Sequence, residues 1–134
     1  MPLVIDVSVM AVWHFKDEES RIAEAALARL EHDEALVPMI WWFELRQVLL
    51  KGERRRRMRV EHADQFLAFL DELSIKVVEL PGTASVMRLA RRHQLSIYDA
   101  AYLELAQRER IELATLDKAL ARAANAEGVA LVAA

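Results

Sequence analysis

The 134-residue chain contains no cysteine and only three glycines and three prolines. Without cysteine it can form no disulfide, use no thiolate nucleophile and build no cysteine-based zinc site. No apolar run approaches the roughly 18 residues that a membrane-spanning helix needs. The first ten residues, MPLVIDVSVM, lack the basic region that opens a secretory signal, so we expect a cytoplasmic protein.

The chain also lacks an excess of positive charge, because its formal net charge is −3. Such a protein does not bind nucleic acid through overall basicity, so any attraction to RNA must come from local arginines or bound cations. The 54% of hydrophobic and 29% of charged residues are typical of a folded protein. The length suits one domain, covering residues 1–134. The four histidines show no metal-binding spacing such as HExxH.

Short apolar segments alternate with helical patterns along the whole chain. We expect strands at residues 3–5, 36–37, 76–80 and 113–115, and leave open a fifth at 129–132. We expect helices from near residue 8, then at 20–31, 39–51, 60–73, 83–93, 96–108 and 118–126, with Gly52 ending the third and Phe66, Phe69, Leu70 and Leu73 facing inward in the fourth. This alternation predicts an α/β fold with a central parallel sheet of four or five strands and helices on both faces.

Three aspartates stand where helices begin. Asp6 follows the first expected strand, Asp117 follows the fourth, and Asp99 lies three residues after Ser96 in a capping-box spacing. Each one alone is explained better as a helix cap than as a functional residue. Together they are more suggestive, because the carboxyl ends of parallel strands and the following helix N-termini share one edge of a sheet.

Glu44 is harder to explain structurally. On its helix it shares an apolar stripe with Ile40, Trp41 and Val48. A buried, unpaired carboxylate costs several kcal/mol, so Glu44 needs a cation, a proton or a route to water. Four acids without a neighbouring cysteine or histidine favour a hard cation such as Mg²⁺ or Mn²⁺.

In four segments the sequence resembles the PIN domains, and specifically the VapC-type ribonuclease toxins of toxin–antitoxin pairs. These segments read VIDVS at 4–8, FEL at 43–45, LSIYDAAY at 95–102 and LATLD at 113–117. The resemblance covers essentially the whole chain and matches the family's acids to Asp6, Glu44, Asp99 and Asp117. It also matches hydroxyl positions that line the family's site to Ser8 and Thr115. One departure is Gln47, where many members have asparagine.

The resemblance implies a PIN-like fold, Mg²⁺- or Mn²⁺-dependent endoribonuclease activity, a homodimer and a cognate antitoxin protein. Under this hypothesis Asp6 and Asp99 are the principal metal ligands, while Glu44 and Asp117 support a second metal or orient water. Two related alternatives stay open, a PIN nuclease of RNA maturation and an inactive PIN scaffold. A response-regulator receiver domain fits less well, because Asp6 stands alone after the first strand and no aspartate follows the third.

A basic run follows the third expected helix and includes Arg54, Arg55, Arg56 and Arg57. It is a candidate contact for RNA phosphates or for an acidic antitoxin segment, although a solvated connection between helices explains it as well. Trp13 and Phe15 either line an antitoxin groove or belong to the core, and we expect Trp41 to be a core residue.

Overall fold

The computed structural model of the protein describes residues 1–15 and 17–133. This part of the chain holds four strands and seven helices, in the order β1 (Leu3–Ile5), α1 (Val7–His14), α2 (Arg21–Arg29), β2 (Ala35–Val37), α3 (Ile40–Arg54), α4 (Val60–Asp71), β3 (Ile75–Val77), α5 (Thr83–His93), α6 (Ile97–Glu109), β4 (Glu112–Ala114) and α7 (Lys118–Ala126). The strands form one sheet in the order β3-β2-β1-β4, and every pairing is parallel. The predicted α/β fold is thus confirmed.

Strand β1 occupies the centre of the sheet because it is apolar on both faces. Leu3, Val4 and Ile5 are fully buried, as expected for a parallel strand covered by helices on both sides. Leu3 pairs with Ala35 of β2 on one side and with Glu112 of β4 on the other. Asp6, the residue that follows β1, therefore lies between the ends of β2 and β4.

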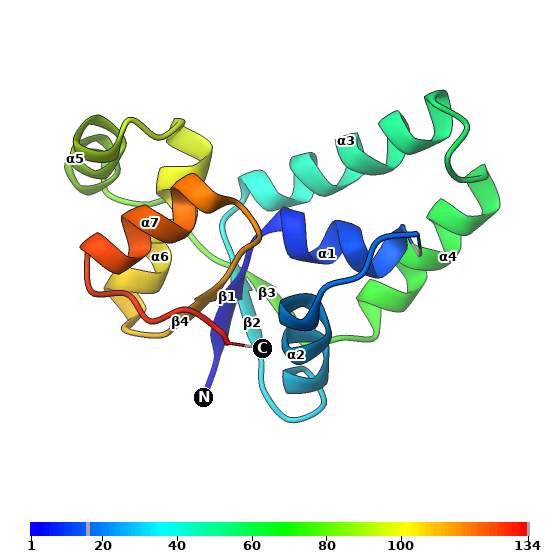
Figure 1. The fold of residues 1–134 in the computed structure, drawn as a ribbon, viewed down its shortest axis with the longest axis horizontal. Helices are drawn as coiled ribbons and strands as arrows, with labels where there is room; N and C mark the ends of the chain where they lie inside the picture. The colour runs from blue at the N-terminus through cyan, green and yellow to red at the C-terminus, as the bar shows by residue number, and fades with distance from the viewer. Residues whose placement is uncertain (16, 134) are drawn as a thin grey trace.

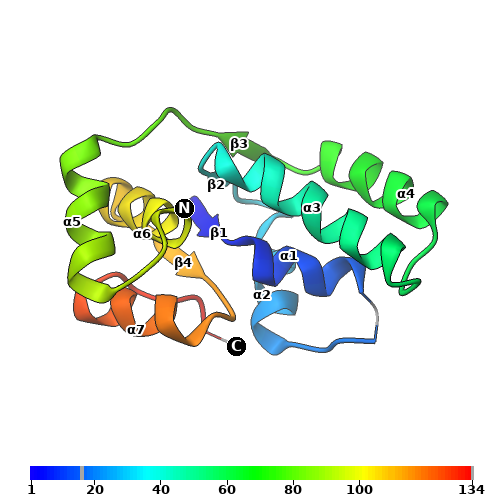
Figure 2. The ribbon, with the colours of Figure 1, turned by 90° about the horizontal axis from the view of Figure 1, so that it is seen from above.

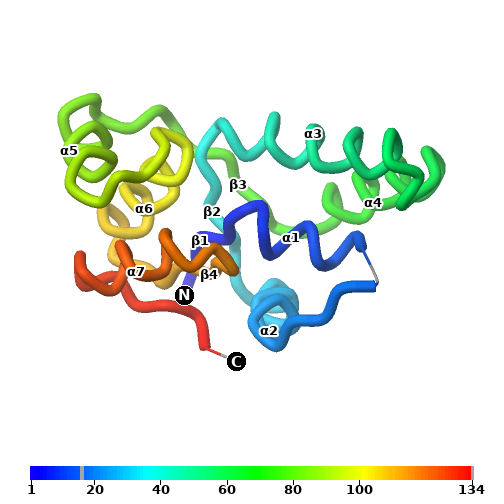
Figure 3. The backbone as a smooth tube through the Cα atoms, turned by 45° about the horizontal axis from the view of Figure 1, so that its top comes forward, coloured from blue at the N-terminus to red at the C-terminus, as the bar shows by residue number. Residues whose placement is uncertain are grey.

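The helices divide into two groups around the strands. In Figures 1 and 2, α5, α6 and α7 lie to one side of the sheet, while α1, α2 and α4 lie to the other. Helix α3 begins beside the strands and runs outward, and Figure 3 shows that it forms a projecting hairpin with α4. No helix in the described residues is long and apolar enough to cross a membrane.

Gly52 does not end the third helix, so that prediction was wrong. Helix α3 continues to Arg54, and Gly52 is buried inside it. A Cβ atom at Gly52 would lie 2.7 Å from Cζ of Phe15, a core residue just after α1. The glycine therefore serves the close approach of α3 to Phe15 rather than a helix terminus.

One further prediction was wrong, and the structure decides one possibility that the sequence left open. Phe69 is 39% exposed instead of facing inward, whereas Phe66 and Leu70 are buried as expected. The segment 129–132 runs beside β4 but forms only one isolated bridge, between Leu113 and Leu131.

We predict that Gly52→Ala destabilises the fold by about 1–3 kcal/mol, because the added methyl group overpacks a buried contact. An alanine inside a helix would otherwise be stabilising by roughly 0.5–1 kcal/mol, so the sign of the change is diagnostic. Gly82→Ala is the matched control, since a Cβ there meets nothing within 4 Å. Denaturant unfolding measures both variants, and an unchanged or higher stability of Gly52→Ala would contradict the packing.

Candidate active site

Asp6 lies at the carboxyl end of β1 and is only 4% exposed. It is the N-cap of α1, where its Oδ1 accepts a hydrogen bond from the Ser8 backbone N–H at 2.9 Å. Its own backbone N–H donates to the carbonyl of Ala114 at the end of β4. Burial raises the pKa of Asp6 above its usual range, and the hydrogen bonds that it accepts offset part of this rise.

Two hydroxyl groups connect Asp6 to the segment after β4. The Ser8 hydroxyl donates to Oδ1 of Asp6, and the Thr115 hydroxyl donates to Oδ2. The backbone N–H of Leu116 donates to Ser8 Oγ, and that of Asp117 donates to Thr115 Oγ1, both at 3.0 Å. These bonds fix the orientation of the Asp6 carboxyl and join the starts of α1 and α7.

Glu44 lies in the second turn of α3 and is half-buried. The hydroxyl of Tyr102, a fully buried residue of α6, donates a 2.8 Å hydrogen bond to its Oε1. Burial raises the pKa of Glu44, and the negative charges of Asp99 and Asp6 raise it further. As the apolar stripe in the sequence indicated, the Glu44 carboxyl is therefore only partly in contact with water.

Asp99 and Asp117 start the two helices on the other side of the sheet. Ser96 caps α6, where its Oγ accepts from the Asp99 backbone N–H at 3.1 Å. Asp117 caps α7 and accepts from the Leu120 N–H at 2.9 Å. Burial raises the pKa of Asp99, and the nearby charge of Asp117 adds to the rise. Asp117 is therefore a helix cap as its position predicted, whereas at α6 the cap is Ser96 and Asp99 takes part through its backbone N–H.

The four acids influence one another electrostatically but do not form one compact cluster. Within residues 1–15 and 17–133, no three acidic or histidine side chains come close enough to hold a single metal ion among them. Mg²⁺ ordinarily keeps several waters and binds through one or two carboxylates plus substrate phosphates. The donor set, oxygen ligands without sulfur or imidazole, therefore suits such a cation, although the assignment of these four acids as ligands stays a prediction.

Tyr102 is the residue that sequence reasoning missed. It lies three residues after Asp99 on the same helix, a spacing that places both side chains on one face of α6. Burial, together with the charge of Glu44, raises the pKa of its hydroxyl. Tyr102 therefore stays a hydrogen-bond donor to Glu44.

The basic run lies away from these acids. Arg54 is ten residues after Glu44 on α3, which corresponds to about 15 Å of helix. Arg57 already has partners, since it lies over the ring of Phe15 and donates to Asp17 at 3.2 Å. The run therefore forms the tip of the α3–α4 hairpin rather than a wall of the acidic site.

Comparisons with known proteins agree on one family. The model of the PIN domain family matches residues 3–126. Ribonuclease VapC3 of Pyrobaculum aerophilum is 33% identical over 125 residues, which cover 90% of this chain and 93% of that protein.

Solved structures show the same fold at low sequence identity. The VapBC2 structure from Rickettsia felis, bound to a DNA fragment from their promoter, superposes with a TM-score of 0.69 at 14% identity and covers 98% of this chain and 97% of that one. VapC20 of Mycobacterium tuberculosis, a sarcin-ricin loop cleaving toxin, gives a TM-score of 0.61 at 13% identity over 90% of this chain and 94% of its own. PAE2754 of Pyrobaculum aerophilum gives 0.67 at 22% identity over 92% and 84% of the two chains.

We predict that Asp99→Asn raises the melting temperature of the metal-free protein at neutral pH. Since folding raises the pKa of Asp99, the folded state takes up its proton more readily than the unfolded state, and ionisation of Asp99 at neutral pH opposes folding. The gain should shrink as the pH falls below the usual aspartate range, where the side chain is protonated in both states. Asp64→Asn, at an exposed residue of α4, is the control for the loss of one charge.

Thermal unfolding in chelator across a pH series measures this difference. A lower melting temperature for Asp99→Asn than for the parent at neutral pH would contradict the unfavourable electrostatics of the site.

Proposed function

Because the chain belongs to the PIN domain family and is related to a VapC ribonuclease along nine-tenths of its length, we propose that it is an endoribonuclease, the toxin of a toxin–antitoxin pair. The observation that carries the proposal is Asp6, a buried carboxyl oriented by two hydroxyls at the carboxyl end of the central strand. Ligands of open α/β sheets bind at this edge. We also propose that the protein acts in the cytoplasm, where cellular RNA is available as substrate.

The activity depends on a divalent cation, as is general among PIN ribonucleases, and we propose Mg²⁺ or Mn²⁺. Asp6 and Asp99 would hold the ion, and Glu44 and Asp117 would support it or a second one. When bound, such a cation neutralises the scissile phosphate and lowers the pKa of a coordinated water. The raised pKa values of Asp6, Glu44 and Asp99 support this proposal, because mutually repelling, partly desolvated carboxyls gain most from a nearby cation.

The protein's own groups orient the reaction. The hydroxyls of Ser8 and Thr115 fix both oxygens of Asp6. Tyr102 holds Oε1 of Glu44, so that Oε2 is left to accept a hydrogen bond from the attacking water. Water adds to phosphorus, the 3′ oxygen leaves, and the products carry a 5′-phosphate and a 3′-hydroxyl.

We predict that Asp6→Asn lowers RNA cleavage by at least 10²-fold in Mg²⁺ and in Mn²⁺, because it removes a negative ligand from a preorganised site. Asparagine still caps a helix well, so the fold should persist. Asp64→Asn makes the same chemical change on an exposed part of α4 and serves as control. Cleavage of total RNA and calorimetric metal binding measure the effect, and full activity of Asp6→Asn would overturn the assignment.

We place the antitoxin at a cavity of about 720 Å³ between α1, α2 and α4. Trp13, Phe66 and Phe69 supply apolar walls, and the polar part of the lining includes Arg57 together with Asp17, to which it donates a hydrogen bond. The buried Nε2 of His14, which also lines this cavity, has no hydrogen-bond partner in the described residues. The apolar walls favour an amphipathic segment, and the exposed Arg54, Arg55 and Arg56 of the adjoining hairpin tip are candidate partners for acidic side chains on it.

We place the homodimer contact on α3, on the side turned away from the core. Met39, Phe43 and Leu50 are 47%, 62% and 41% exposed and recur at helical spacing along one stripe. Ile97 and Tyr98, in the first turn of α6, are also exposed. Large exposed apolar side chains gathered in this way are typical of interaction surfaces.

We predict that Phe43→Asp and Phe69→Asp separate these two contacts. A charge in an apolar interface is poorly solvated, so Phe43→Asp should convert the dimer to a monomer, and Phe69→Asp should weaken antitoxin binding at least tenfold. Each variant is the control for the other, because the two residues lie on different helices. Light scattering gives the mass and calorimetry the antitoxin affinity. A parent that is monomeric, or a Phe69→Asp variant with full affinity, would contradict the respective contact.

A further inference from the structure

Helices α5 and α7 carry five arginine and lysine side chains and no acidic one. All five are exposed, and together we call them the α5/α7 basic band: Arg88, Arg91, Arg92, Lys118 and Arg122. The whole chain has a net charge of −3, so the negative excess lies entirely outside these two helices. Charge in this protein is therefore segregated rather than mixed.

The band begins beside the acidic site, at the start of α7. Helix α7 begins immediately after Asp117, with Lys118 as its first residue and Arg122 one turn later on the same face. Helix α5 ends at His93, just before the turn that leads to Asp99. Both helices pack against α6, and Figure 2 shows them on either side of it. Lys118 and Arg122 therefore lie next to Asp117, whereas Arg88 and Arg92 extend the band away from the acids, because they lie near Glu127 at the other end of α7.

Most of the band's charge is not neutralised within the protein. Glu127, directly after α7, is the one acid that pairs with it in the described residues. Its nearest partners are His93 at 2.6 Å and Gln107 at 3.0 Å, while Arg88 and Arg92 stay at 3.7 and 3.6 Å. A single carboxylate shared in this way leaves the two arginines with a net positive charge.

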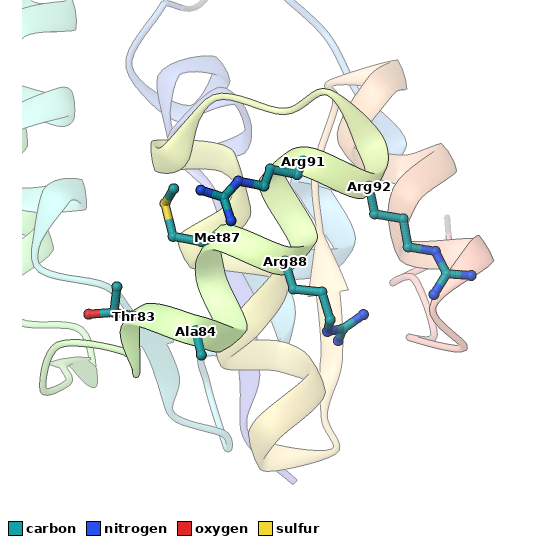
Figure 4. Close-up of a pocket in the computed structure, with 6 residues that line it drawn as sticks. All are labelled: Thr83, Ala84, Met87, Arg88, Arg91 and Arg92. Carbon is teal, nitrogen blue, oxygen red and sulfur yellow. The ribbon is translucent and has the colours of Figure 1, made fainter.

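Figure 4 shows how the arginines of α5 are directed. Arg88 and Arg92 extend from the side of the helix that faces α7, while Arg91 and Met87 extend from the other side. These side chains border a shallow hollow on α5 together with Thr83 and Ala84. Guanidinium groups with free donors around an open hollow can each bind phosphate oxygens.

From this placement we propose that the α5/α7 basic band binds the phosphate backbone of the RNA substrate next to the cleavage site. The inference rests on the proposed ribonuclease function and names the side chains that hold its substrate. Neutralised phosphates release counterions, which is the main source of sequence-independent affinity for nucleic acid. The arginine run at 54–57 is assigned to the antitoxin side, because Arg57 lines the cavity there and the run begins ten residues after Glu44 on α3.

The test compares two pairs of substitutions in the cleavage-blocked Asp6→Asn protein. Lys118→Gln with Arg122→Gln removes two charges from the band, and Arg54→Gln with Arg55→Gln removes two equally exposed charges from the hairpin tip. The probe is a short, fluorescently labelled single-stranded RNA, and its anisotropy is measured in chelator over a range of salt concentrations. Circular dichroism checks that each protein is folded, and Arg91→Gln is a second band variant.

The band pair should bind the RNA about tenfold more weakly at physiological salt. Its plot of log affinity against log salt should be shallower by about 1.4, since each lost phosphate contact to a single strand accounts for roughly 0.7 of the slope. The tip pair should change both quantities much less. Equal losses in the two pairs, or a band pair that binds RNA normally but antitoxin poorly, would overturn the inference.

The outcome for the band is separate from the outcome for the function. If the parent protein cleaves RNA but the band pair binds like the tip pair, the inference fails and the ribonuclease proposal stands. If the parent cleaves no RNA in Mg²⁺ or Mn²⁺ and the band pair still loses affinity, the ribonuclease proposal fails while RNA binding by the band stands.

Discussion

The structure depends on a carboxyl group that is buried where four elements meet. Asp6 ends the central strand, caps α1, and receives hydroxyl hydrogen bonds from Ser8 on its own helix and from Thr115 after β4. A carboxylate removed from water is costly unless hydrogen bonds or a cation compensate it. The two hydroxyls supply part of that compensation, and they also fasten the start of α7 to the start of α1. The hydrogen bonds that compensate the buried Asp6 carboxyl therefore also set how the starts of α1 and α7 lie at this edge of the sheet.

Stability and function make opposite demands on the acids around Asp6. Burial and mutual repulsion raise the pKa values of Glu44 and Asp99, so their ionised forms work against folding at neutral pH. The structure keeps Tyr102 beside Glu44 as a neutral donor, which orients the carboxyl without cancelling its charge. An arrangement that served stability alone would place a cationic side chain there. Its absence among the described neighbours fits a site that leaves negative charge available to a divalent ion.

Short-range sequence patterns were enough to predict much of the fold. The predictions that failed concern features that depend on tertiary contacts. The limits of α7 and the Ser96 cap follow from sequence because caps and helical periodicity act within one turn. The role of Gly52 was predicted wrongly because it depends on a close contact with Phe15, which is distant in sequence. Of the site, the strand-end and helix-start positions of the acids could be predicted, together with the stripe around Glu44. The Tyr102 contact could not, because it depends on how α3 and α6 pack.

The distribution of charge predicts different partners for the two sides of the sheet, RNA on the side of α5 and α7 and a protein on the side of the α3–α4 hairpin. An acidic centre repels phosphate by itself, and screening confines each charge to a range of about 8–10 Å. Basic side chains therefore help only if they lie close to the acids, as Lys118 and Arg122 do at the start of α7. A divalent ion on the acids would turn the local repulsion into attraction, so metal and RNA should strengthen each other's binding. The hairpin tip lies too far along α3 to take part, which leaves its arginines and the neighbouring cavity free for a protein partner.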